Sequence, residues 1–241
     1  MSSYLTVDSL RNLYCHIEVD HAGLVLKFSL LRPMVTNESL RNRYLEGPRG
    51  PGFRAVVEAL CNDCVLTIRR LFNDAKDDTR SLGTIFHPFL PANRSKFEAV
   101  LSQLRTDREK MKTRRNREPD FDHLVEAISD AWPKLSREAE QFGHVNNLWI
   151  TRYRVEEIET DYYRNAAAGS FIDLFNRLEQ MIPGISHLLI NLGNALSALD
   201  SDTSVPGLRS ARNAHAFWGI SDYGARYSQS LHSSLPGLRR E

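Results

Sequence analysis

The stretch TRYRVEEIETDYYR, Thr151 to Arg164, gathers residue types that act on phosphates and protons. Its arginines could hold a phosphate through parallel N–H bonds, and a carboxylate could exchange a proton if its pKa were raised. On a helix, Glu156 would lie one turn after Arg152, which is ion-pair spacing. Two interpretations follow. The stretch is either a structural arginine–glutamate network or a remodelled polar site that holds a phosphate through Arg152. We favour the network, because such pairs are common.

Other patterns that could carry chemistry are weaker. Cys61 and Cys64 form a C-x-x-C, but the chain has only three cysteines, and a structural zinc site needs four ligands. We expect both cysteines in a helix as small, buried apolar residues. The eight histidines show no H-x-x-x-H spacing, and the glycines form no phosphate-binding loop. We therefore expect no metal site, no cofactor and no covalent catalysis.

A basic run lies between Arg105 and Glu118, where seven basic and three acidic residues give a net charge of +4. This charge could contact a few phosphates in a salt-dependent way, and Arg114 and Arg115 are its candidate contacts. The run has no interleaved aromatic side chain on which a base could stack. Charge runs are usually solvated, so we favour a solvated helix end or connection.

The elements that must position these residues are helices. The clearest is predicted over 53–72, where apolar residues recur at steps of three and four on one stripe. This stripe contains Phe53, Val57, Leu60, Cys64, Ile68 and Leu71. A looser pattern predicts a helix over 7–31 that Pro33 stops. Thr36-Asn37-Glu38 then caps a short helix that runs through Tyr44.

The rest of the chain also has a helical period. Helices are predicted from Phe97 into the basic run, over 121–142 across Pro133, and over 144–163. A further helix or helix pair over 171–199 is interrupted at Pro183-Gly184. No alternating run of strand length appears. We therefore predict an all-α fold, an antiparallel helical bundle around one core with a charged helical insert.

Length and composition bound the remaining choices. The 241 residues are 41% hydrophobic and 25% charged, and they can bury a core. We predict a helical domain over 1–200, which includes the basic segment 105–118, and a linker with a C-terminal helix and tail over 201–241. The net charge of +1 predicts no global attraction to nucleic acid or membrane. Few cysteines, no signal peptide and no bilayer-spanning stretch lead us to expect a cytoplasmic protein without membrane contact.

A short pattern links the chain to a known family. Residues 37–85 read NESLRNRYLEG and then a long helix that ends LTIRRLFNDAKDDTRSLGTIF. Arg70-Leu71-Phe72-Asn73 at the end of that helix, a polar turn, and Ser81-Leu82 opening the next helix resemble the abortive-infection U-type branch of the HEPN superfamily. The resemblance covers most of residues 5–200. It implies an all-α and often dimeric protein, and many members are metal-independent ribonucleases with an Arg-x(4–6)-His motif.

The family's catalytic helix falls on the opening stretch. There the family arginine matches Arg152, and a second basic position matches Arg154. The family histidine would fall at 157, 158 or 159, where this chain has Glu157, Ile158 and Glu159. The resemblance thus carries over the phosphate-binding arginines but not the group that exchanges a proton near neutral pH.

Arginine and histidine recur at this spacing at six other places, 11/16, 80/87, 117/123, 137/144, 209/215 and 226/232. Spacing alone does not choose among them. Arg209 and His215 form the best alternative catalytic pair, although they follow the family core.

Three hypotheses follow, of which we favour the first. The chain is a HEPN-like protein that lacks the standard pair and acts by binding RNA or a protein partner, in phage defence or a toxin–antitoxin system. We expect a homodimer with no small-molecule cofactor. The second hypothesis is a metal-independent endoribonuclease that uses a displaced histidine. The third is a helical interaction domain with no role in nucleic-acid binding.

Overall fold

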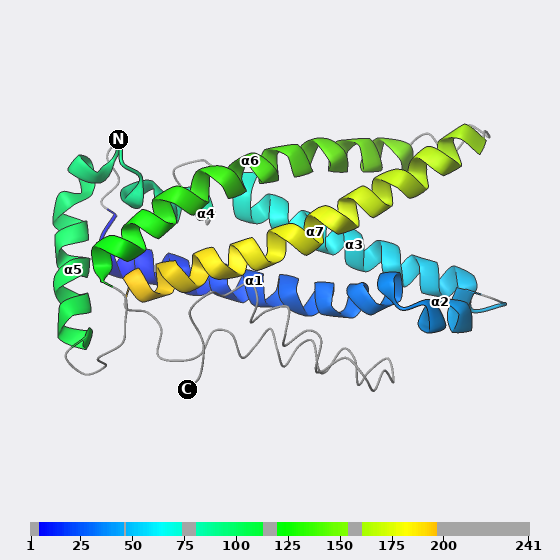
Figure 1. The fold of residues 1–241 in the computed structure, drawn as a ribbon, viewed down its shortest axis with the longest axis horizontal. Coiled ribbons are helices and arrows are strands. Elements are labelled where there is room, and N and C mark those ends of the chain that lie inside the picture. Colours follow the sequence, from blue (N-terminus) through cyan, green and yellow to red (C-terminus); the bar gives the residue numbers. More distant parts are fainter. Residues whose placement is uncertain (1–4, 46, 74–80, 113–119, 154–160, 197–241) are drawn as a thin grey trace. The chain divides into compact units, whose positions relative to one another are not determined.

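The computed structural model describes residues 5–45, 47–73, 81–112, 120–153 and 161–196, and over these residues the chain is all-α (Figure 1). This confirms the predicted fold class. Within the described part no strand occurs, and no helix has the length and apolar character needed to cross a membrane. The helices are α1 (Val7–Thr36), α2 (Glu38–Leu45), α3 (Gly50–Asn73), α4 (Leu82–Phe86), η1 (His87–Phe89), η2 (Arg94–Phe97), α5 (Glu98–Lys112), α6 (Phe121–Tyr153) and α7 (Asp161–Ala195).

The described residues divide into two compact units, which we describe separately. The larger unit contains 5–21 and the described residues from 64 to 196. The smaller unit contains the described residues from 22 to 63. The described residues of the stretch 151–164 belong to the larger unit, and the described residues between α2 and α3 belong to the smaller one.

The larger unit contains the helical hairpin of α6 and α7, which pack along each other in opposite directions (Figure 1). Helix α7 contributes buried residues at helical spacing, and they lie on one apolar face. Gly184 lies at a close approach of the two helices, because a Cβ there would lie 3.1 Å from Leu135 Cδ1. The buried residues of α7 are Leu174, Phe175, Leu178, Met181, Ile182, Ile185, Leu188, Leu189, Leu192 and Ala195.

The first half of α1 also lies against α7 in the larger unit. The Arg11 Nε donates to the carbonyl of Leu196 at 2.9 Å, and His21 Nε2 lies 2.9 Å from Ser186 Oγ. From Arg11 to His21 the residue numbers increase by ten along α1, whereas their partners, Leu196 and Ser186, decrease by ten along α7. The two segments run antiparallel, as the predicted bundle requires.

The smaller unit has its own apolar core between α1, α2 and α3. Met34, Leu40 and Phe53 form its buried centre. Asn37 caps α2, since its side-chain oxygen accepts from the Leu40 N–H at 2.8 Å, which confirms the predicted capping segment. The partly buried residues packed around this centre are Tyr44, Leu45, Val57 and Leu60.

Three predicted helix boundaries are wrong. Helix α1 continues past Pro33 to Thr36, α7 continues past Pro183, and α6 continues past Phe142 to Tyr153 without a break before His144. A proline inside a helix costs about 3 kcal/mol, and burial of apolar residues on both sides can offset that. Met34, directly after Pro33, and Ile182 and Ile185, on the two sides of Pro183, are such residues, because each is almost fully buried.

The predicted helix over 53–72 is confirmed as α3, with a qualification about its stripe. Phe53, Cys64, Ile68 and Leu71 are buried, whereas Leu60 is only partly buried. The stripe changes from one unit to the other at Cys64, so its residues belong to two separate packing environments.

We expect Ile68→Ala to lower the free energy of unfolding by about 2–5 kcal/mol, because it removes a fully buried side chain from a packed core. Leu60→Ala, on the same helix but only partly buried, should cost clearly less. Urea unfolding followed by circular dichroism would measure both. Equal losses would contradict the burial pattern of α3.

Candidate functional site

Most of the sequence-predicted site residues lie outside the described part of the structure. Arg154, Arg114 and Arg115 are in segments that are not described, and so are the alternative pair Arg209 and His215. Arg152 lies near the end of α6, but its side chain is not among those described. The stretch 151–164 enters the structure as the last residues of α6 and the first residues of α7.

The described helical part of the basic run has four exposed residues, Arg105, Thr106, Glu109 and Lys110, and one buried arginine. Arg108 is only 3% exposed on α5. Arg105 pairs with Asp122 of α6, and its guanidinium lies over the ring of Phe121 at 5.7 Å from the centroid. Part of the positive charge of this run therefore holds α5 against α6. The side chain of Arg105 nevertheless remains 50% exposed.

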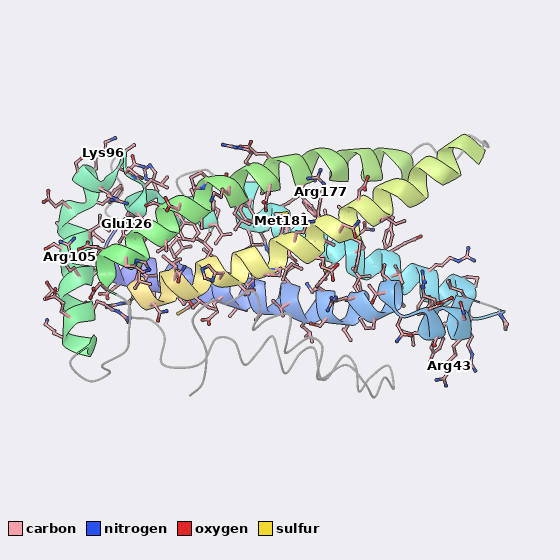
Figure 2. The ribbon with its side chains drawn as sticks, viewed as in Figure 1. Arg43, Lys96, Arg105, Glu126, Arg177 and Met181 are labelled. Atoms are coloured by element: carbon pink, nitrogen blue, oxygen red, sulfur yellow. The ribbon has the colours of Figure 1, made fainter. Side chains whose placement is uncertain are left out.

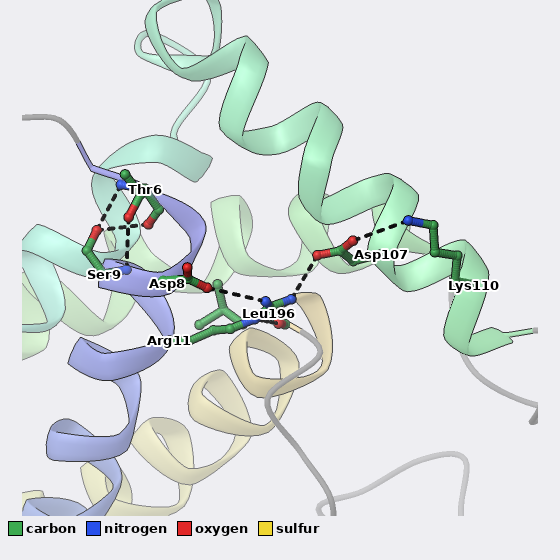
Figure 3. A network of polar contacts seen from close by, with 7 residues as sticks. All are labelled: Thr6, Asp8, Ser9, Arg11, Asp107, Lys110 and Leu196. Carbon is green, nitrogen blue, oxygen red and sulfur yellow. Dashed lines mark hydrogen bonds and ion pairs between the residues drawn. The ribbon is translucent and has the colours of Figure 1, made fainter.

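Arg11 of the Arg11/His16 pair has a structural role (Figure 3). Its guanidinium contacts Asp107 Oδ2 on α5 at 3.0 Å and donates to the Leu196 carbonyl at the end of α7. It thus joins three helices and satisfies a carbonyl that the helix end leaves without an intrahelical donor. His16 is exposed, and five helical positions place it about 140° around α1 from Arg11. These two residues do not converge on one site.

A second polar contact in the larger unit joins His21 to Ser186. The Ser186 hydroxyl donates to the Ile182 carbonyl at 2.9 Å, so its oxygen accepts from His21 Nε2. This fixes the neutral imidazole as the Nε2–H tautomer. Burial lowers the pKa of His21 to about 4, although the Ile182 carbonyl acts in the opposite direction. At neutral pH this histidine is therefore an uncharged structural group.

Tyr14 and Glu18 lie on the same side of α1 as His21, at spacings of three and four residues. Burial raises the pKa of both side chains, and the charge of Glu18 further raises that of Tyr14. Among the described residues, the Tyr14 hydroxyl has no hydrogen-bond partner, and this side chain is 1% exposed. Burial on this side of α1 thus disfavours the charged forms of Tyr14, Glu18 and His21.

We expect His21 to lower the free energy of unfolding as the pH is decreased from about 6.5 to 4. The unfolded histidine, with a pKa of about 6.5, binds a proton that the folded state resists. The loss between pH 7 and pH 5 should be up to about 2 kcal/mol larger in the wild type than in His21→Gln. His123→Gln, at an exposed position, is the matched control. Parallel profiles for the wild type and His21→Gln would contradict this assignment.

Cys61 and Cys64 are both buried in α3 as free thiols, as expected. Burial raises the pKa of Cys61 to about 12, and the charge of Glu58 adds to this effect. A thiol with so high a pKa is a poor nucleophile and a poor metal ligand. Within the described residues no group of three metal-ligating side chains occurs.

A group of exposed arginines lies in the smaller unit, and sequence reasoning did not identify it. We call it the arginine turn, and it consists of Arg41 and Arg43 on α2, Arg49 in the connection, and Arg54 on α3. Figure 2 shows the side chain of Arg43 projecting away from α2. The signal was present, because residues 41–54 hold four arginines and one glutamate, a net charge of +3, with Tyr44 and Phe53 interleaved.

Two glycines set the backbone of the arginine turn. Gly47 has a φ of +106°, which side chains with a Cβ rarely adopt. Gly50 begins α3 so close to α2 that a Cβ on it would lie 2.7 Å from the Leu45 carbonyl oxygen. Pro48 and Pro51 further restrict this connection, since each fixes its own φ. The position of Arg49 between the two helices is therefore determined by the backbone.

Gly50→Ala should lower the free energy of unfolding by about 1–3 kcal/mol, because the added methyl group overlaps a backbone oxygen. Gly52→Ala is the matched control, since nothing lies within 4 Å of its added Cβ. That variant should gain about 0.5–1 kcal/mol from the better helix propensity of alanine. Thermal unfolding of the two variants measures the difference, and a stable Gly50→Ala would show that α2 and α3 do not approach as described.

The residues that carry the family resemblance stabilise the larger unit. Arg70 pairs with Asp20 at 2.8 Å, and the ring of Phe72 stacks on Trp132 with the two planes 4° apart. Ser81 caps α4, because its hydroxyl accepts from the Thr84 N–H at 3.3 Å. The predicted opening of a helix at Leu82 is thereby confirmed. Comparison of the chain with family models, with curated proteins and with solved structures finds no match in any of the three.

Proposed function

We propose that the chain is a HEPN-like helical protein that binds RNA or a protein partner and does not cleave RNA. The observation that carries the proposal is the junction between α3 and α4. There the residues of the resemblance do what its pattern requires. Phe72 packs at the end of a long helix, and Ser81 opens the next. The family architecture thus has local support, while Glu157, Ile158 and Glu159 replace its histidine.

The chemistry of those replacements supports binding over cleavage. Proton transfer from a ribose hydroxyl near pH 7 needs a group that titrates in that range. A glutamate with its ordinary pKa of about 4.3 is already ionised and is a weak base. An adjacent arginine such as Arg152 would lower that value further. The arginine can still hold a phosphate, so binding survives the loss of the histidine.

The setting is also part of the proposal. A HEPN-like protein without its nuclease pair would act in phage defence or in a toxin–antitoxin system by occupying RNA or a partner protein, and a second copy of the chain is the first partner to test. The packed helices described here are compatible with that role. Size-exclusion chromatography with light scattering would measure the oligomeric state.

We expect purified wild-type protein to leave single-stranded RNA intact in the presence of EDTA, as followed by gel electrophoresis. Glu157→Ala and Glu159→Ala should not change this result, since neither residue acts as a base. If the wild type cleaves RNA and a folded Glu159→Ala does not, the stretch 151–164 is an altered active site. If His215→Ala abolishes cleavage instead, the displaced-histidine ribonuclease replaces the proposal.

A further inference from the structure

We propose that the arginine turn binds the phosphodiester backbone of single-stranded nucleic acid. The inference rests on the proposed binding function, and it adds a surface that the family resemblance does not contain. The surface belongs to the smaller unit, at the connection between α2 and α3. It is separate in sequence from Arg152, Arg154 and the basic run 105–118.

The first support is that no ion pair among the described residues neutralises the arginine turn. All four of its arginines are exposed, and none forms an ion pair with a described residue. Other arginines of the chain are held by the fold. Arg11 and Arg70 have aspartate partners, and Arg94 donates to the Phe89 carbonyl. The arginine turn therefore concentrates +3 over fourteen residues in a chain whose net charge is +1.

The second support is the type of cation. All four positive groups are guanidinium groups and none is an ammonium group. A guanidinium presents N–H donors in a planar fork that matches two oxygens of a phosphate, and it loses less hydration on contact than an ammonium group does. A phosphodiester chain offers one such charge per nucleotide, so several exposed arginines can bind it without reading its sequence.

The third support distinguishes a nucleic acid from an acidic protein. Tyr44 is partly exposed among the arginines, and its ring stacks on Phe53 with centroids 5.5 Å apart and planes 3° apart. The guanidinium of Arg43 lies 5.6 Å from the centre of the same ring. Flat aromatic and guanidinium groups beside a basic surface are the usual means by which single strands are bound. The basic run 105–118 has no such ring arrangement in its sequence.

The fourth support is that the surface is built in advance. Gly47 with its positive φ and Gly50 against the Leu45 carbonyl fix the connection that carries Arg49. Met34, Leu40 and Phe53 anchor the flanking helices in the core of the smaller unit. Binding therefore has little backbone entropy to lose, which favours affinity for a ligand held mainly by charge.

The test uses the full chain and fluorescence anisotropy with labelled 20-nucleotide RNA and DNA of one sequence. Arg43→Gln/Arg49→Gln should weaken binding about tenfold at moderate salt, because it removes two phosphate contacts at the surface. The slope of log affinity against log salt should fall by about 0.7 for each arginine lost, as expected for single strands. Lys134→Gln/Arg137→Gln removes the same charge from exposed positions of α6 and should change binding little.

The RNA and DNA probes identify the source of the phosphodiester. Equal losses for both show that the arginine turn recognises the backbone alone, and a loss for one probe assigns the site to that nucleic acid. If the wild type binds and the Arg43/Arg49 variant binds equally well, the inference is wrong while the proposed function stands. The ligand class is wrong if neither probe binds, or if poly-glutamate binds tighter and shows the same dependence on Arg43 and Arg49.

Discussion

The larger unit depends on the burial of one continuous apolar face of α7. From Leu174 to Ala195 its buried side chains follow helical spacing without a gap, and they pass Pro183 without interruption. A lost backbone hydrogen bond at that proline is a local cost, whereas each buried aliphatic side chain contributes roughly 1.5–3 kcal/mol. The helix therefore stays intact, and α6 and the first half of α1 have a continuous apolar surface to pack against. Gly184 permits the close approach of α6 at the same place.

Polar groups then determine how the helices around this face are held. Arg11 joins α1, α5 and the end of α7, and His21 meets Ser186 one segment further along. Arginine, histidine and serine also occur in active sites. Here their side chains contact neighbouring helices, so they contribute to packing. Burial keeps the imidazole of His21 uncharged and makes Cys61 hard to ionise. His21 of the larger unit and Cys61 of the smaller unit thus contribute to the packing of the fold. The arginine turn of the smaller unit differs, since its arginines remain exposed.

The sequence predicted the helices well wherever a single physical signal decided them. The stripe of α3 and the Asn37 cap of α2 are local features, and both were found at the expected residues. The helix boundaries predicted at Pro33 and Pro183 were wrong. The free-energy cost of a proline in a helix is local, whereas the packing that offsets it involves residues distant in sequence. The burial of Arg108 within the basic run was not predicted for the same reason, since it arises from the tertiary packing of α5. The arginine turn was overlooked because its glycines and prolines indicate a connection, and whether the four arginines are exposed depends on the fold.

The uneven placement of charge has a consequence for how the protein meets surfaces in general. The sequence pI is about 7.8, and a molecule at its isoelectric point is often treated as indifferent to charged matrices. A concentrated patch changes that, because adsorption depends on the charge that faces the matrix and the opposite charge can turn toward solvent. The residues outside 41–54 carry a net charge of −2 in sum, because the whole chain carries +1. We therefore expect a cation exchanger to retain the protein near neutrality through the four exposed arginines of the arginine turn.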